Sequence, residues 1–152
     1  LPLRSKPMGA PVAVLLIYRD EAAVLWAGDA RLYRHVGEEM TRLTRDHTPV
    51  QALVDAGDID ERQAMSHPRA HVIYQAIGNG DKLELEQARF DISADQQFLL
   101  TTDGVHSVLT VGDLARLLGE GASESAILKA ALDAGSRDNV TAVKVSADEH
   151  YR

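Results

Sequence analysis

Two aspartates, Asp103 and Asp138, stand next to predicted strands, where their carboxylates could take part in chemistry. Asp103 follows the strand-forming run of residues 97–100, and Gly104 after it lets the chain turn sharply out of a sheet. Asp138 comes just before a second strand pattern, at residues 140–145. Two strands that each carry a carboxylate at one end can bring both to one point, and paired carboxylates suit Mg2+ or Mn2+. The alternative is that the Asp-Gly pair is only a turn.

The first part of the chain has the pattern of antiparallel strands. Residues 10–18 are a nearly continuous apolar run, and a polar turn separates them from residues 22–26, so the two runs predict a hairpin. Residues 31–36 and 40–43 resume the pattern after short interruptions. We therefore expect a meander of antiparallel strands here.

The middle of the chain mixes helical and strand patterns. Helical spacing begins at Pro49 and stops at Gly57, and a second short helix is expected through Met65 with Asp58 or Asp60 as its cap. Further strands are predicted at residues 72–77, 83–85 and 89–92.

The last third carries two amphipathic helices. One is expected from Thr110 or Gly112 through Leu118, and the next follows the N-cap Ser123 and closes at Gly135. Because the helices are segregated from the strands rather than alternating with them, the fold class is α+β. Residues before 10 read as an irregular lead-in and residues 148–152 as a tail.

Composition excludes several classes of function. The 152 residues carry 16 Lys and Arg against 23 Asp and Glu, a net charge of −7, which argues against a nucleic-acid or anionic-membrane partner. The absence of cysteine excludes disulfides, thiolate catalysis and cysteine-bound zinc, and fits a cytoplasmic protein. No apolar run approaches the roughly 18 residues that span a bilayer.

Four stretches, taken in order, resemble the motifs of one family. Residues 27–33 (AGDARLY) are similar to the Gly-Asp-Ser-Arg motif of the PPM-type metal-dependent serine/threonine protein phosphatases, and residues 43–48 (LTRDHT) to its Leu-Thr-x-Asp-His-Ser. Residues 100–104 (LTTDG) resemble its Ser-Asp-Gly strand end, and residues 135–141 (GSRDNVT) its C-terminal Asp-Asn motif. Residues 53–69 also look like the flap of bacterial members. The resemblance covers nearly the whole chain.

The resemblance implies a fold and an activity. The fold is an antiparallel β-sandwich flanked by helices on both outer faces, in four αββα layers. The activity is hydrolysis of phosphoserine and phosphothreonine in proteins by a water activated between two Mn2+ or Mg2+ ions. The implied partners are a phosphoprotein substrate and an opposing serine/threonine kinase in a bacterium.

Positions that match the family motifs receive roles from them. Asp103 and Asp138 would be metal ligands, with Gly104 and Asn139 supporting the loops that hold them. Asp29 would help hold a third, weaker metal, or would only cap a turn.

Two further matched positions are supporting residues. We expect Arg31 to be a buried structural partner. We expect His47 to be either an acid near the site or a structural histidine whose hydrogen bonds are made within the fold. No catalytic residue beyond the metal ligands is expected. Ser107 stands where the family often has a third-metal Asp, which argues against a tightly held third metal.

The chain lacks the family's N-terminal portion, which carries a phosphate-gripping Arg and a metal-bridging Asp. Residues 1–152 therefore resemble the C-terminal portion of a single domain, and the chain alone is expected to be inactive. Exposed sheet edges would then be covered by the missing N-terminal segment or by strand exchange in an oligomer. The alternative function is a catalytically incomplete, phosphatase-like binding or regulatory module.

Overall fold

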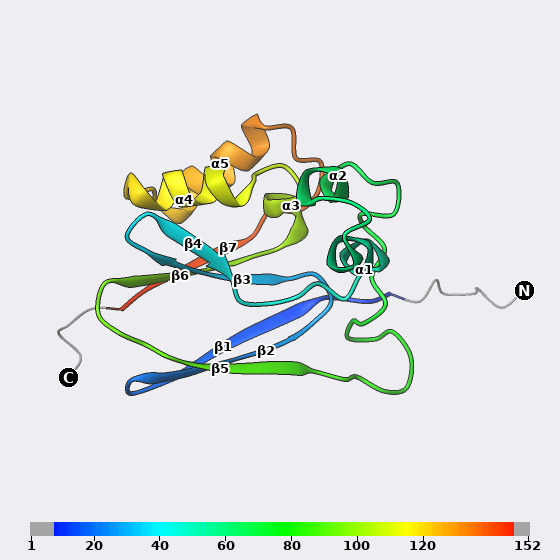
Figure 1. Ribbon diagram of the computed structural model, residues 1–152, viewed down its shortest axis with the longest axis horizontal. Helices are drawn as coiled ribbons and strands as arrows, with labels where there is room; N and C mark the ends of the chain where they lie inside the picture. Colours follow the sequence, from blue (N-terminus) through cyan, green and yellow to red (C-terminus); the bar gives the residue numbers. More distant parts are fainter. Residues whose placement is uncertain (1–7, 148–152) are drawn as a thin grey trace, which may run out of the picture.

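Two antiparallel sheets and a group of helices make up the computed structural model, which describes residues 8–147 (Figure 1). The first sheet has the order β1-β2-β5 and the second the order β4-β3-β6-β7. These elements confirm the α+β class. The strands of the first sheet are β1 (Val12–Tyr18), β2 (Glu21–Ala27) and β5 (Glu86–Asp91). Those of the second are β3 (Arg31–Val36), β4 (Glu39–Arg42), β6 (Gln96–Thr101) and β7 (Ala142–Ser146).

The first four strands do not form the single meander that the sequence predicts. β1 and β2 pair as the expected hairpin, but β3 pairs with β4 and β6 in the other sheet. The chain changes sheets at Gly28, whose φ of 98° lies in the region that favours glycine. A Cβ there would lie 2.7 Å from the Cβ of Pro11 and 3.0 Å from the carbonyl oxygen of Gln75, so only glycine fits.

The helices agree with the sequence pattern because their caps are local. Thr110 caps its helix through a capping box with Asp113, and Ser123 and Asp60 also accept hydrogen bonds from the first turns of their helices. The helices are α1 (Pro49–Ala56), α2 (Glu61–Met65), α3 (Asp103–His106), α4 (Val111–Gly119) and α5 (Glu124–Asp133). In the described part of the chain, none of them has the length and apolar character needed to cross a membrane.

The four-stranded sheet packs on both of its faces. On β6, Phe98 faces the other sheet and joins Val24, Trp26 and Leu32 in one core, whereas its neighbour Leu99 joins the core under the helices. That second core holds Val105, Leu109, Leu114, Leu118, Ile127 and Ala131. Residues 8–147 thus form three layers, sheet on sheet on helices, with α4 and α5 over the four-stranded sheet (Figure 1). No helix within this range covers the outer face of the three-stranded sheet, so the fourth layer that we expected is not found among these residues (Figure 1).

Two predicted strands are wrong. Residues 72–77 and 83–85 are irregular, apart from a single bridge between Ala10 and Ile77. Tyr74 N donates to the carbonyl oxygen of His47, which lies in a loop, so this backbone has no neighbouring strand to pair with. The strand predicted at residues 89–92 instead begins at Glu86. The predicted lead-in before residue 8 and the tail after residue 147 lie outside the described residues.

One side of the sandwich is open. β1 and β7 are edge strands of their sheets, and an apolar groove of about 520 Å3 lies between them. Val12, Val14 and Leu15 line it from one sheet, and Leu100, Val143 and Val145 from the other. On β1, Val14 and Ile17, which line this groove, are 43% and 48% exposed. Residues 8–147 therefore leave apolar surface and strand edges uncovered along this side.

Candidate metal site

The end of β6 and the loop before β7 are joined by two hydrogen bonds. Thr102 N donates to the carbonyl oxygen of Thr141 at 3.2 Å, and Thr141 N donates to Oγ1 of Thr102 at 3.1 Å. Asp103 begins α3 directly after this junction, and Asp138 lies in the joined loop. The two aspartates singled out from the sequence are therefore carried by neighbouring, mutually bonded segments at one end of the sheet.

Gly104 is required where these segments meet. A Cβ at this position would lie 2.1 Å from the carbonyl oxygen of Asn139, a distance that no side chain can accept. Ser136 Oγ also donates to the carbonyl oxygen of Gly104 at 2.6 Å. The glycine thus lets α3 approach the loop that carries Asp138.

The carboxylate of Asp138 is exposed and turned partly toward its own loop. Its Oδ1 accepts a hydrogen bond from the backbone N–H of Asn139 at 2.7 Å. This contact between neighbouring residues orients the side chain. Asn139 follows Asp138 directly in the sequence, and the hydrogen bond from its backbone N–H joins the two residues in the structure.

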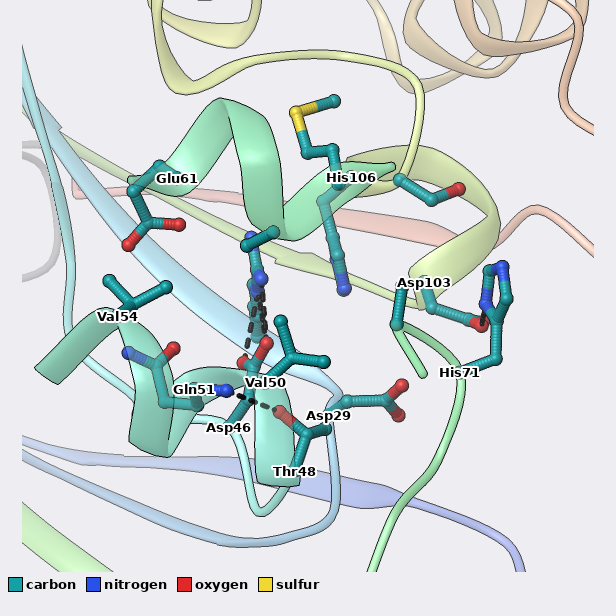
Figure 2. A pocket seen from close by; sticks show the side chains of 15 residues that line it. Asp29, Asp46, Thr48, Val50, Gln51, Val54, Glu61, His71, Asp103 and His106 are labelled. Atoms are coloured by element: carbon teal, nitrogen blue, oxygen red, sulfur yellow. Dashed lines mark hydrogen bonds and ion pairs between the residues drawn. The ribbon is translucent and has the colours of Figure 1, made fainter. Parts of the chain in front are cut away.

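Asp29 lies in the connection between β2 and β3, and it is only 6% exposed. Burial and the nearby carboxylates of Asp103 and Asp46 raise its pKa to about 6, although Arg31 acts in the opposite direction. Asp29 and Asp103 line one pocket, in which Figure 2 shows the Asp103 side chain directed toward His71. A bound divalent cation would offset the repulsion between these carboxylates. Asp29 and Asp103 are therefore suited to bind a metal ion.

A second opening carries Asp138. Asp103 and Asp29 line the pocket of Figure 2, whereas Asp138 lines an adjoining cleft, and both openings share Met65, His71 and Ser107. His71 also reaches Asp103, with its Nδ1 3.5 Å from Oδ2. Within residues 8–147, no three His, Asp or Glu side chains gather closely enough to hold a metal ion. The described residues therefore supply a partial ligand set.

Arg31 is held away from the carboxylates of Asp29 and Asp103 by a partner of its own. Its Nε and Nη2 donate to the two carboxylate oxygens of Asp46 at 2.9 and 2.6 Å, and its Nη1 donates to the Tyr33 hydroxyl at 3.1 Å. A guanidinium used in this bidentate way is committed to the fold.

His47 contacts the segment that precedes Asp29. Its Nδ1 accepts a hydrogen bond from Gly28 N at 3.0 Å, and its own backbone N–H donates to the carbonyl oxygen of Gly28 at 2.9 Å. The imidazole stacks on Trp26, with 6.2 Å between ring centroids. These contacts hold the sheet-changing turn in place.

Sequence reasoning missed His106 and Asp46, which also line the pocket. His106 is buried, its Nδ1 lies 2.9 Å from Oγ1 of Thr101, and its ring points into the pocket (Figure 2). Burial, with the charges of Arg31 and Arg42, lowers its pKa well below the usual value of 6.5. A spacing of three residues from Asp103 could have indicated His106, because such residues share a helix face.

Comparison with known proteins gives relatives over nearly the whole chain. The protein phosphatase PhpP of Streptococcus pneumoniae is 28% identical over 146 residues, which are 93% of this chain and 59% of PhpP. The solved structure of PppA, a regulatory component of T6SS in Pseudomonas aeruginosa, matches with a TM-score of 0.81 and 33% identity, over 92% of this chain and 58% of PppA. No protein-family model matches the chain.

A metal-bound structure is among those the chain resembles. The catalytic domain of the serine/threonine protein phosphatase PstP, solved in complex with 2 manganese ions, matches with a TM-score of 0.81 and 27% identity. The match covers 93% of this chain and 60% of that one. The chain thus spans about six-tenths of the length of these relatives.

Proposed function

This chain is homologous to the bacterial PPM-type serine/threonine protein phosphatases, and from that premise we propose that the intact protein hydrolyses phosphoserine and phosphothreonine in proteins. The observation that carries the proposal is the pair of carboxylates, Asp29 and Asp103, in one pocket beside the loop of Asp138. Burial and the nearby carboxylates of Asp103 and Asp46 raise the pKa of Asp29, and such shifted groups cluster at functional sites.

We assign the metal-binding role to Asp103 and Asp138, with Asp29 as a weaker ligand. When bound, Mn2+ or Mg2+ lowers the pKa of a coordinated water and neutralises charge on the phosphate. The chain's own part is positioning: the bonds between Thr102 and Thr141 hold the two ligand segments together. The two manganese ions in the PstP structure support this assignment.

We further propose that residues 1–152 are the C-terminal portion of a single phosphatase domain. The partial ligand set and the open groove between β1 and β7 support this view, because both need residues from elsewhere. The rest of the domain would complete the sandwich, and a strand-exchanged oligomer is the alternative. The chain alone would then be inactive.

The cellular setting is also a proposal. An opposing serine/threonine kinase would supply the phosphoprotein substrate, since a phosphatase acts on the product of such a kinase. A cytoplasmic location rests on the cysteine-free sequence.

The test measures phosphate release from a phosphothreonine peptide by the intact protein. We expect release with Mn2+, none with EDTA, and none from residues 1–152 alone. An intact protein that releases no phosphate with Mn2+ or Mg2+ would contradict the proposal. The incomplete ligand set would then favour a phosphatase-like binding module.

A further inference from the structure

The cleft that adjoins the metal pocket has a lining suited to a peptide. It measures about 470 Å3 and lies between the end of α2 and the 71 region on one side and the 135–138 loop on the other. Met65 and Val108 are half-buried in its wall, and Asp138, which we assign as a metal ligand, also lines it. A peptide whose phosphorylated residue reaches the metal ligands would place its neighbouring residues in this cleft.

Arg137 is the arginine of this cleft. It is exposed, and no carboxylate among residues 8–147 forms an ion pair with it. Arg42 and Arg45 differ from it, because Arg42 binds Gln51 and Glu61, and Arg45 binds Asp55. Arg137 therefore offers a guanidinium whose donors are available to a ligand.

The net charge of the chain bears on which peptides Arg137 could favour. With a net charge of −7, the chain as a whole disfavours acidic ligands at long range. A preference for acidic peptides would therefore come from a local contact in the cleft. An arginine fork pairs with a carboxylate or a second phosphate through two hydrogen bonds.

We propose that Arg137 determines substrate specificity by binding an acidic residue next to the phosphorylated residue of the peptide. The Met65 and Val108 wall contacts the aliphatic part of the same segment. This inference rests on the proposed phosphatase function, and it adds a substrate class and a specificity-determining residue to it.

The experiment compares two phosphothreonine peptides that are identical except for flanking residues, which are Asp in one and Lys in the other. With the intact protein and Mn2+, we expect kcat/KM to favour the Asp peptide by about fivefold, chiefly through KM. Arg137→Gln should bring the ratio close to one, Arg137→Glu should invert it, and Arg137→Lys should retain part of it. Arg116→Glu on the exposed surface of α4 is the matched charge-reversal control, and it should keep the wild-type ratio.

Two results would overturn the inference while leaving the phosphatase function standing. One is equal hydrolysis of both peptides by the wild type, and the other is an acidic preference that persists in both Arg137→Gln and Arg137→Glu. If neither peptide is hydrolysed with metal present, the proposed function itself fails, and the inference fails with it.

Discussion

Arg31 and Asp46 form a two-pronged ion pair beside the metal pocket: Nε lies 2.9 Å from Oδ1, and Nη2 lies 2.6 Å from Oδ2. The pair joins the first residue of β3 to the loop that precedes α1. The side chains are only 16% and 8% exposed, so neither charge is well solvated. Arg31 also partly offsets the negative charge around Asp29.

Removing one member of this pair should destabilise the fold strongly. Asp46→Ala leaves the Arg31 guanidinium buried without its partner, which costs about 3 kcal/mol of unfolding free energy. Urea unfolding of the variant measures this loss. Asp133→Ala, which breaks the exposed pair with Lys129, is the control and should cost less than about 0.5 kcal/mol. Equal, small losses in both variants would contradict the structural role of the pair.

Asp29 should make the metal-free protein less stable as the pH rises. Its folded pKa of about 6 exceeds the ordinary value of 3.8, so its contribution is favourable below pH 4 and is lost as the pH rises through 6. In EDTA at pH 7.5, Asp29→Asn should therefore raise the unfolding free energy by about 3 kcal/mol. The gain should vanish near pH 4. Asp81→Asn, on an exposed loop, should show no such trend, and a pH-independent effect of Asp29→Asn would contradict the argument.

His106 should make the protein less stable as the pH falls. Because its folded pKa is depressed, the unfolded chain takes up a proton that the folded chain excludes, and stability falls as the pH drops below 6.5. We expect His106→Gln to lose less stability than the wild type between pH 6.5 and 5, as measured by urea unfolding at each pH. His67→Gln, outside the pocket, is the control. Parallel pH curves for the wild type and His106→Gln would refute the prediction.

Gly104→Ala should disturb the two ligand segments together. The added Cβ would meet the Asn139 carbonyl oxygen, so the loop of Asp138 must shift, at a cost of about 1 to 3 kcal/mol. The Mn2+-induced rise in Tm of the intact protein should shrink accordingly. Gly112→Ala in α4 is the matched control: its Cβ would find its nearest neighbour at 3.7 Å, and better helix propensity should make it neutral or stabilising. A full Mn2+ response in Gly104→Ala would contradict the packing argument.

The sequence predicts what is decided locally. Helix caps such as Thr110 and Ser123 lie within one turn of the residues they bond, so their signals survive in a single sequence. The hairpin of β1 and β2 is equally local. By contrast, β3 pairs with β6, which lies far along the chain, and nothing in the strand pattern distinguishes this from pairing with β2. Residues 72–77 have the composition of a strand, but they pair only at Ile77, through a single bridge to Ala10.

Part of the candidate site can likewise be predicted from the sequence, and part cannot. Asp103 and Asp138 stand at strand ends and can be found from turn residues and motif order, but their separation into adjoining openings cannot. Asp46 lies inside a recognised motif, yet its pairing with Arg31 depends on how two loops meet in space. His106 carries no pattern beyond its spacing from Asp103, because burial gives it its properties.

The most direct test of the central claim is calorimetric titration of Mn2+ into the intact protein and its Asp103→Asn, Asp138→Asn and Asp133→Asn variants. The account predicts that the first two substitutions weaken Mn2+ binding by at least about tenfold, because each removes a charged oxygen ligand. Asp133→Asn, on the exposed face of α5, should bind like the wild type. Wild-type Mn2+ affinity in both Asp103→Asn and Asp138→Asn would contradict the metal site and the function built on it.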